Sequence, residues 1–209
     1  MEIIPAILTD NEQEAISDIK SFEGVFNWVQ IDVLDDTWIA GKTVHPEVFV
    51  DEVESLNIEV HLMVEKPEEY FDACKYLSAQ RVYVHAEAVE SISQTLDEMK
   101  NYPFQKGIAI NPYTPVEAIT LYTADIDAVL VMTVVPGKQG QEFMSEAVKK
   151  IQEIKKINSN LHVGVDGGVN EKTLKQVVVA GADMAAVGSA IAKLGGPQKA
   201  KKILENACR

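Results

Sequence analysis

Four polar side chains interrupt stretches of sequence that are otherwise apolar and β-branched. Gln30 and Asp32 share one face of WVQIDVL, His61 lies in IEVHLMV, and Asp166 ends HVGVD. Because strand side chains alternate between two faces, Gln30 and Asp32 point together, away from the valine and isoleucine face. Paired carboxylates suit general acid–base catalysis, and aspartate with histidine supplies the ligand types of a divalent-metal site. These residue types predict proton transfer, metal binding or both.

Each of these groups also has a structural explanation, as a hydrogen-bonded polar residue of the interior. For His85, in the apolar stretch RVYVHAE, that explanation is as good as a role in a site. It is weaker for Asp32, His61 and Asp166 together, because burying unpaired carboxylates is costly unless a cation or a ligand compensates them. A shared functional site is therefore the preferred hypothesis.

Eight short β-branched stretches alternate with amphipathic ones along the chain, and they predict the elements that position these groups. Helical patterns fill the intervals, and Pro46, Pro67 and Pro115 stand where first helical turns are expected. Strands that alternate with helices indicate a parallel sheet. The predicted strands are residues 3–8, 28–34, 58–64, 81–87, 107–111, 128–134, 162–167 and 184–189.

The expected fold is a single-domain (β/α)8 TIM barrel of the α/β class, spanning residues 1–209. The alternative is an open, doubly wound sheet, which would carry a glycine-rich fingerprint after its first strand, and IIPAILTDNEQ has none. In a barrel the strands end at one mouth, where active sites lie. Asp32, His61 and Asp166, from the second, third and seventh strands, are expected to meet there.

The same mouth is expected to hold the rest of a ligand site. Glycine-containing turns follow the last two strands, where barrels frequently bind phosphate on backbone amides. The loop 136–140 suits a lid, and its Lys138 would add a charge near a phosphate. Met63 and Met132 would line an apolar wall or fill the barrel. The predicted substrate-binding residues are Met63, Met132, Asn111, Gly137, Gly140, Gly167, Gly168, Gly188 and Ser189.

The composition narrows the choice of partner. The 209 residues carry a formal net charge of −13, which argues against nucleic acid and anionic membrane surfaces but permits a small phosphorylated ligand. No stretch is apolar enough to span a membrane, and the first residues are unlike a signal peptide. Cys74 and Cys208 lie far apart, make no metal-type cluster and suit reduced thiols. We expect a cytoplasmic protein that acts on a small molecule.

These motifs resemble the ribulose-phosphate 3-epimerase family, a branch of the ribulose-phosphate-binding barrels. The resemblance covers nearly the whole chain and implies a metal-assisted epimerisation at C3 of a pentulose 5-phosphate by a homo-oligomer. It depends on motifs in a specific order and spacing. They are PAIL (5–8), QIDVLDD (30–36), VHLMVEKP (60–67), VHAEA (84–88), NPYTP (111–115), VLVMTVVPGKQGQEF (129–143), VDGGVN (165–170) and AGADMAAVGSAI (180–191).

The resemblance also implies roles for individual residues. Asp32 and Asp166 would be the acid and base that act on opposite sides of the substrate through an enediolate. Asp32, His61 and Asp166 match metal ligands of the family, but Gln30 stands where the family has a histidine as the remaining ligand. An amide oxygen is a harder and weaker donor than imidazole. Among Mg, Mn, Fe and Zn, the incomplete ligand set therefore favours magnesium or manganese over zinc.

Further departures from the family lie at the same reacting end of the site. Ala6 replaces a substrate-holding serine, Asp36 a glycine and Val135 an asparagine. Ala6, Gln30 and Asp36 favour an alternative, a non-catalytic or weakly active sugar-phosphate-binding barrel, whereas retention of both aspartates favours the isomerase. A lyase or decarboxylase of the same barrel group would be expected to carry a lysine in QIDVLDD or VHLMV, and neither motif contains one. Epimerisation of a ketose phosphate at C3 is the predicted function.

Overall fold

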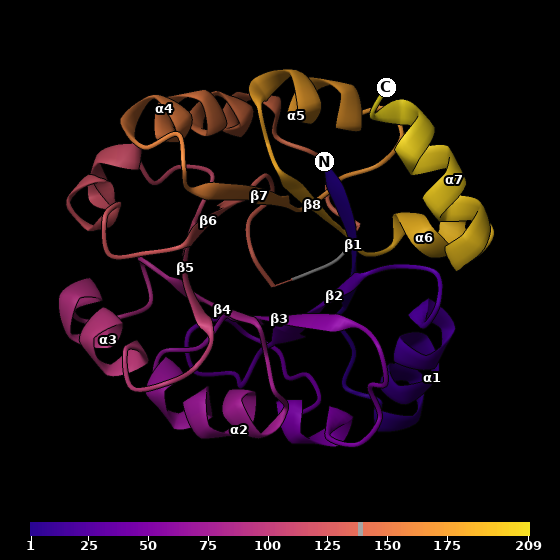
Figure 1. The fold of residues 1–209 in the computed structure, drawn as a ribbon, viewed down its shortest axis with the longest axis horizontal. Helices are drawn as coiled ribbons and strands as arrows, with labels where there is room; N and C mark the ends of the chain where they lie inside the picture. The colour runs from indigo at the N-terminus through magenta and orange to yellow at the C-terminus, as the bar shows by residue number, and fades with distance from the viewer. Residues whose placement is uncertain (138–139) are drawn as a thin grey trace.

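Eight parallel strands close into a barrel in the computed structural model, which describes residues 1–137 and 140–209. Each strand pairs with its neighbour in the chain, and β1 pairs with β8 to complete the ring (Figure 1). The predicted TIM barrel is confirmed. The strands are β1 (Glu2–Ile7), β2 (Trp28–Val33), β3 (Asn57–Leu62), β4 (Arg81–His85), β5 (Gln105–Ile110), β6 (Ala128–Met132), β7 (His162–Asp166) and β8 (Met184–Val187).

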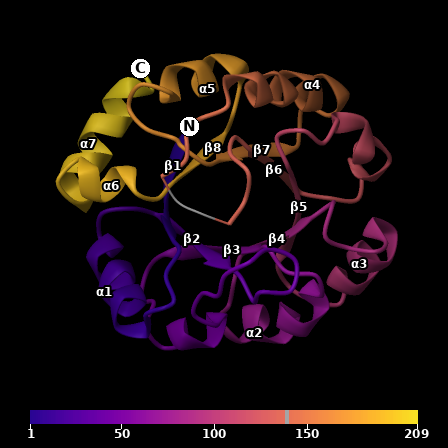
Figure 2. The same cartoon turned by 180° about the vertical axis from the view of Figure 1, so that it is seen from behind.

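The α-helices surround the strands and separate them from solvent, as both views of the barrel show (Figure 2). α1 begins after Asn11, whose side-chain oxygen accepts a hydrogen bond from the backbone N–H of Glu14 and so caps the first turn. The helices are α1 (Glu12–Phe22), α2 (Phe71–Tyr76), α3 (Ile92–Met99), α4 (Lys149–Ile157), α5 (Leu174–Ala180), α6 (Ala190–Lys193) and α7 (Pro197–Ala207).

Two of the predicted helical intervals form only short 3₁₀ turns. The interval after β2 has one at Pro46–Phe49, and the interval after β5 has two, at Val116–Ala118 and Thr120–Tyr122. In the second interval the Thr120 hydroxyl donates to the carbonyl of Val116, four residues earlier. Both predicted helices are replaced by short 3₁₀ turns.

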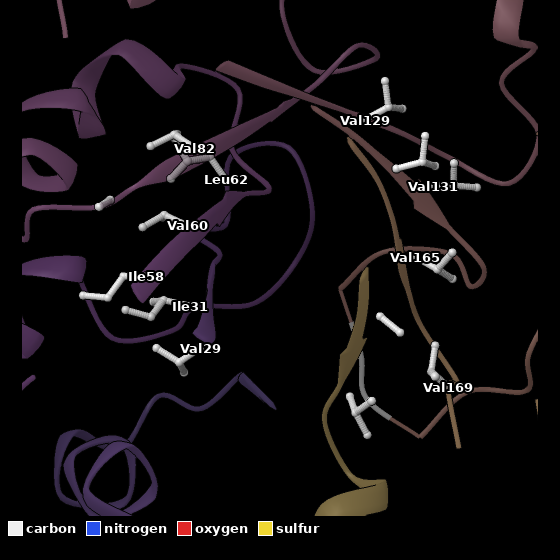
Figure 3. Packing of buried hydrophobic residues seen from close by; sticks show 14 of the residues in the cluster. Val29, Ile31, Ile58, Val60, Leu62, Val82, Val129, Val131, Val165 and Val169 are labelled. Atoms are coloured by element: carbon white, nitrogen blue, oxygen red, sulfur yellow. The ribbon is translucent and has the colours of Figure 1, made fainter. Parts of the chain in front are cut away.

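The apolar side chains of the strands form the main core between the barrel wall and the helices. Figure 3 shows Val29 and Ile31 of β2 beside Ile58 and Val60 of β3 in this layer. All four are nearly inaccessible, and the alternation predicted for WVQIDVL therefore holds. The opposite face of each strand points into the barrel, which is the face that carries the polar residues.

Strand register brings those polar residues to one depth. Asp32 is paired with His61 across β2 and β3, and Asp166 with Met132 across β7 and β6. Because all the strands run in the same direction, Asp32, His61 and Asp166 collect at the carboxyl end of the barrel, and Gln30 lies two residues before Asp32 on the same face. The fold thus creates at one mouth the group that the sequence distributes over more than a hundred residues.

Candidate active site

A cavity of about 340 Å³ opens at the carboxyl ends of the strands. Many of the predicted site residues line it, while Gln30 and His61 lie fully buried beneath it. Lys138, predicted to approach a phosphate, lies outside the described residues. The predicted residues that border the cavity are Asp32, Asp166, Met63, Met132, Gly137, Gly140, Gly167, Gly168, Gly188 and Ser189.

A single amide joins the two carboxylates. Gln30 Nε2 donates one hydrogen bond of 2.8 Å to Asp32 Oδ1 and another of 2.8 Å to Asp166 Oδ2. Gln30 Oε1 is buried and finds no hydrogen-bond partner within residues 1–137 and 140–209. A buried carbonyl without a partner is costly, which is typical of a functional site rather than of a folding core.

His61 supplies a positive charge beside the same carboxylates. Its Nδ1 lies 3.0 Å from Asp32 Oδ1 and 3.4 Å from Asp166 Oδ2. Burial alone would lower the pKa of His61, but the hydrogen bonds and charges of Asp166 and Asp32 raise it to about 9. Burial, followed by the charge of Asp166, raises the pKa of Asp32. Protonated His61 therefore lies beside two carboxyl groups, and one of these, Asp32, is biased toward its neutral form.

His85 and Glu87 continue this network away from the cavity. His61 Nε2 lies 2.8 Å from His85 Nε2, and His85 Nδ1 lies 3.2 Å from Glu87 Oε2. Burial lowers the pKa of His85 to about 4, which leaves that ring neutral. Burial would raise the pKa of Glu87, but hydrogen bonds from His85, Thr114 and Asn111 lower it. The sequence analysis left His85 open and missed Glu87, although the pattern His-x-Glu at the end of a strand was the available signal.

Glycines shape the end of the cavity beside β6, β7 and β8. Gly167 and Gly168 both have positive φ, at 109° and 64°. A Cβ on Gly167 would overlap Val134, and one on Gly168 would lie 3.0 Å from the backbone of Phe143, so both positions require glycine. Lys172 and Lys193 line the same region, and the sequence analysis did not single them out. Lys193 Nζ donates to Ser189 Oγ at 3.4 Å, a helical i, i+4 spacing that could have identified it.

Asn111 differs from the other predicted substrate-binding residues because it is not among the residues that line the described cavity. Its backbone N–H donates to Glu87 Oε1 at 2.8 Å, and its carbonyl accepts a hydrogen bond from Lys150. Its side-chain oxygen is buried and without a hydrogen-bond partner in the described part of the chain. A direct contact of Asn111 with substrate stays a prediction.

The residues that depart from the family pattern occupy well-defined places at the mouth. Asp36 has φ of 69°, a conformation suited to the glycine it replaces, and its Oδ1 accepts the backbone N–H of Gly41 at 3.0 Å. Ala6 borders the cavity and is paired with Gln30 in the sheet. A Cβ on Gly137 would overlap Ile39, so the loops after β2 and β6 approach each other closely.

The donor set is compatible with a divalent cation. Asp32, His61 and Asp166 each offer a ligand atom, and these atoms lie within 4.8 Å of one another. Gln30 turns its Nε2, not its oxygen, toward the two aspartates, so its unpaired Oε1 would become a neutral donor to an ion only with the amide turned over. Two carboxylates, one imidazole and one amide suit an oxygen-preferring ion.

Comparisons with known proteins agree with this geometry. The model of the Ribulose-phosphate 3 epimerase family matches residues 2–192. The chain is 35% identical to the ribulose-phosphate 3-epimerase of Bacillus subtilis (strain 168), with 91% of this chain and 92% of that one covered. It is 31% identical to the ribulose-phosphate 3-epimerase of Helicobacter pylori (strain ATCC 700392 / 26695), with coverage of 99% and 97%.

Solved structures agree on the fold. A crystal structure of 3-hexulose-6-phosphate synthase superposes with a TM-score of 0.73 at 19% identity, and the match covers 100% of both chains. At that identity the similarity concerns the barrel alone. Among the helices of residues 1–137 and 140–209, none has the length and apolar character needed to cross a membrane.

Proposed function

The chain belongs to the ribulose-phosphate 3-epimerase family, and on that premise we propose that it interconverts two ketose 5-phosphates that differ in configuration at C3. The observation that carries this proposal is a pair of carboxyl groups, Asp32 and Asp166, which border one cavity and share one amide donor. Inversion at carbon requires a proton to leave from one face and another to arrive at the opposite face. That task suits two acid–base groups.

The proton transfers follow from the different environments of the two groups. In one direction the Asp166 carboxylate removes the C3 proton, the electrons move onto the C2 carbonyl oxygen, and neutral Asp32 protonates C3 on its opposite face. In the reverse direction the roles exchange. The raised pKa of Asp32 supports its assignment as the neutral acid at rest. Each role is worth about 10²- to 10⁴-fold in rate.

Negative charge on the enediolate has to be balanced within the same site. A divalent ion held by Asp32, His61 and Asp166, magnesium or manganese in our proposal, would act as a Lewis acid toward the enediolate oxygens. His61 must be neutral at Nδ1 to bind such an ion, and in its protonated form it supplies a positive charge at the same place. Gln30 holds the two aspartates together through its Nε2, and its unpaired Oε1 would bind the ion only with the amide turned over.

The other end of the cavity suits the phosphate group of the substrate. Gly167, Gly168, Gly188 and Ser189 border it, their backbone amides would bind the phosphate, and Lys193 adds a positive charge close to Ser189. Met63 and Met132 also line the cavity and would give it an apolar wall. In this arrangement the phosphate would bind away from the reacting carbon, and its binding energy would orient C3 between the two carboxyl groups.

The alternative, a sugar-phosphate-binding barrel with little or no activity, is favoured by two substitutions. Ala6 and Gln30 replace a serine and a histidine of the family pattern, and they are paired in the sheet at the reacting end. Both aspartates are nevertheless present and directed at the cavity. A binder would gain nothing from two costly carboxylates with a shared, incompletely satisfied amide.

Deuterium exchange distinguishes the two functions. The protein is incubated in D₂O with a panel of ketopentose and ketohexose phosphates, with and without added Mn²⁺ or Zn²⁺, and deuterium at C3 is measured by NMR. An epimerase incorporates deuterium at C3 and produces the second epimer. A non-catalytic binder would bind the sugar phosphate but incorporate no deuterium at C3. That result would overturn the proposed function.

The remaining expectations concern the surroundings of the enzyme. We infer that it acts as a homo-oligomer in the cytoplasm and does not bind nucleic acid, in keeping with the family and with a net charge of −13. Light scattering coupled to size-exclusion chromatography tests the first of these, and a monomer at micromolar concentration would contradict it.

A further inference from the structure

A line of buried hydrogen bonds leads from the two aspartates to Glu87. His61 Nδ1 faces Asp32 at 3.0 Å, His61 Nε2 faces His85 Nε2 at 2.8 Å, and His85 Nδ1 faces Glu87 Oε2 at 3.2 Å. Both imidazole rings are fully buried. In such a line each contact needs one hydrogen and one lone pair, so the protons on the two rings are not independent.

The carboxylate at the end of the line determines where those protons lie. Glu87 Oε2 accepts hydrogen bonds only, so His85 Nδ1 must carry the proton between them. His85 is fully buried, where a charged ring would be costly, so it is neutral with a lone pair at Nε2, and the 2.8 Å contact requires that His61 Nε2 carries a proton. The nitrogen of His61 that remains adjustable is therefore Nδ1, which faces Asp32 and Asp166.

We propose that Glu87 and His85 are positioning residues that fix the tautomer of His61, so that its Nδ1 is the nitrogen available to the active site. With Nε2 protonated, a neutral His61 presents its Nδ1 lone pair toward the aspartates, as a metal ligand must. The opposite tautomer would place a proton on Nδ1 and exclude an ion. The effect on metal binding rests on the proposed function, whereas the tautomer of His85 does not.

Packing around His85 supports this assignment. The ring of Trp38, from the loop after β2, lies over His85 with centroids 4.6 Å apart at an angle of 46°. His85 ends β4 and has no exposed surface, so the ring cannot turn toward solvent to find another partner. Glu87 is held as well, because its Oε1 accepts the backbone N–H of Asn111 at 2.8 Å.

The two oxygens of Glu87 have different partners, His85 and the backbone N–H of Asn111. A substitution that replaces one oxygen by an NH₂ group therefore tests the tautomer of His85. In Glu87→Gln a single oxygen remains, and the backbone N–H of Asn111, which can only donate, requires it. The new amide nitrogen then faces His85 Nδ1 as a donor. His85 has to accept there and move its proton to Nε2, and His61 has to accept at Nε2 and keep its proton at Nδ1.

The tautomers are measured directly by long-range ¹H–¹⁵N NMR on metal-free protein labelled with ¹⁵N-histidine. His85 of the wild-type protein is expected to be protonated at Nδ1, the less common tautomer of free histidine. Glu87→Gln is expected to move that proton to Nε2, and Glu87→Asp, which keeps a carboxylate, to retain the wild-type pattern. Glu90→Gln is the matched control, because Glu90 is exposed and lies three residues further along.

A second readout follows the metal. In competition with a chromophoric chelator, Glu87→Gln should bind Mn²⁺ about 10- to 100-fold more weakly than wild type, with no such loss in Glu90→Gln. A wild-type His85 protonated at Nε2, or a Glu87→Gln variant with unchanged tautomers, would overturn the inference whatever the enzymatic activity. Absence of C3 exchange with the expected tautomers would instead overturn the proposed function and leave this inference standing.

Discussion

Two polar layers cross the interior of the barrel, one at each end of the strands, and they balance charge in different ways. In the lower layer Glu59 and Arg81 form a 3.0 Å ion pair. The same guanidinium also bonds Tyr83 at 3.3 Å and Gln105 at 3.0 Å, and lies 5.0 Å from the ring centre of Trp28. One acid meets one base, and the donors of the arginine are directed at partners.

The upper layer contains Asp32, Asp166, His61 and Gln30, which set two carboxyl groups against a single cation. Its amide oxygen has no partner in the described chain, and its carboxyl groups reach the cavity rather than closing on each other. The same barrel interior therefore holds a one-to-one ion pair at one end and, at the end where the cavity opens, two carboxyl groups that share one histidine. The contrast teaches that an unequal number of carboxyl groups and cations beside a cavity, more than burial itself, identifies the site.

The comparison predicts that the upper aspartates govern activity. Asp32→Asn and Asp166→Asn should each lower turnover of the ketose phosphate by about 10²- to 10⁴-fold, because each removes one of the two proton carriers. Either variant leaves one carboxylate beside His61, so the free energy of unfolding should stay near that of the wild type. Steady-state kinetics and urea denaturation measure the two effects, with exposed Asp97→Asn as the control. Near-native turnover in either variant would refute the two-aspartate assignment.

The lower layer should show the opposite behaviour. Arg81→Met strands the buried carboxylate of Glu59 and should cost about 3–5 kcal/mol of unfolding free energy. The double variant Glu59→Leu with Arg81→Met removes both charges and should recover most of that loss. Urea denaturation with a constant m-value is the measurement. If the single variant is as stable as the wild type, the lower pair does not compensate a charge, and the distinction between the layers fails.

A substitution at Gln30 tests whether this residue sets the metal preference of the upper layer. Gln30→His replaces an amide oxygen by an imidazole nitrogen and should shift metal preference toward zinc, raising zinc affinity relative to manganese by about 10- to 100-fold. Chelator competition with each metal gives the ratio without reference to activity. Gln94→His, on the exposed surface of α3, controls for added histidine. An unchanged ratio would show that Gln30 does not take part in the metal site.

A smaller effect concerns acid stability at the lower end of β7 and β8. Burial would raise the pKa of Asp183, but the hydrogen bonds of Lys155 and of the Val163 N–H, together with the lysine charge, lower it. A carboxyl group whose pKa is lower in the folded state stabilises the fold above its unfolded pKa, and this stability disappears as the pH falls through the folded value. Asp183→Asn should therefore cost about 1 kcal/mol near pH 7, because the pair is partly exposed, and less below about pH 4. Equal losses at both pH values would contradict this account.

Much of the scaffold could be predicted because it depends on local patterns. The alternation of Val29 and Ile31 with Gln30 and Asp32 predicts both faces of β2, and the repetition of such stretches predicts the barrel. The lengths of the helices could not be predicted as well. The helical patterns after β2 and β5 form only short 3₁₀ turns, because the extent of a helix depends on tertiary packing as well as on the apolar pattern.

The candidate site was only partly accessible from sequence, for a similar reason. Asp32, His61 and Asp166 are ionisable residues in apolar strands, which is a local signal, and the structure brings them together. The bridge made by Gln30 and the contact of His85 with Glu87 depend on distances across strands. Residue type alone leaves open which atom of an amide, or which nitrogen of a ring, faces a partner.

The central claim is that Asp32 and Asp166 exchange protons with opposite faces of the same carbon. Deuterium exchange at C3 in D₂O, measured separately for each epimer with Asp32→Asn and Asp166→Asn, tests it most directly. The account predicts reciprocal behaviour: each variant loses exchange of the epimer whose proton the missing carboxylate removes, and retains slower exchange of the other without net epimerisation. Loss of exchange of the same epimer in both variants, or undiminished exchange of both epimers in either one, would contradict it.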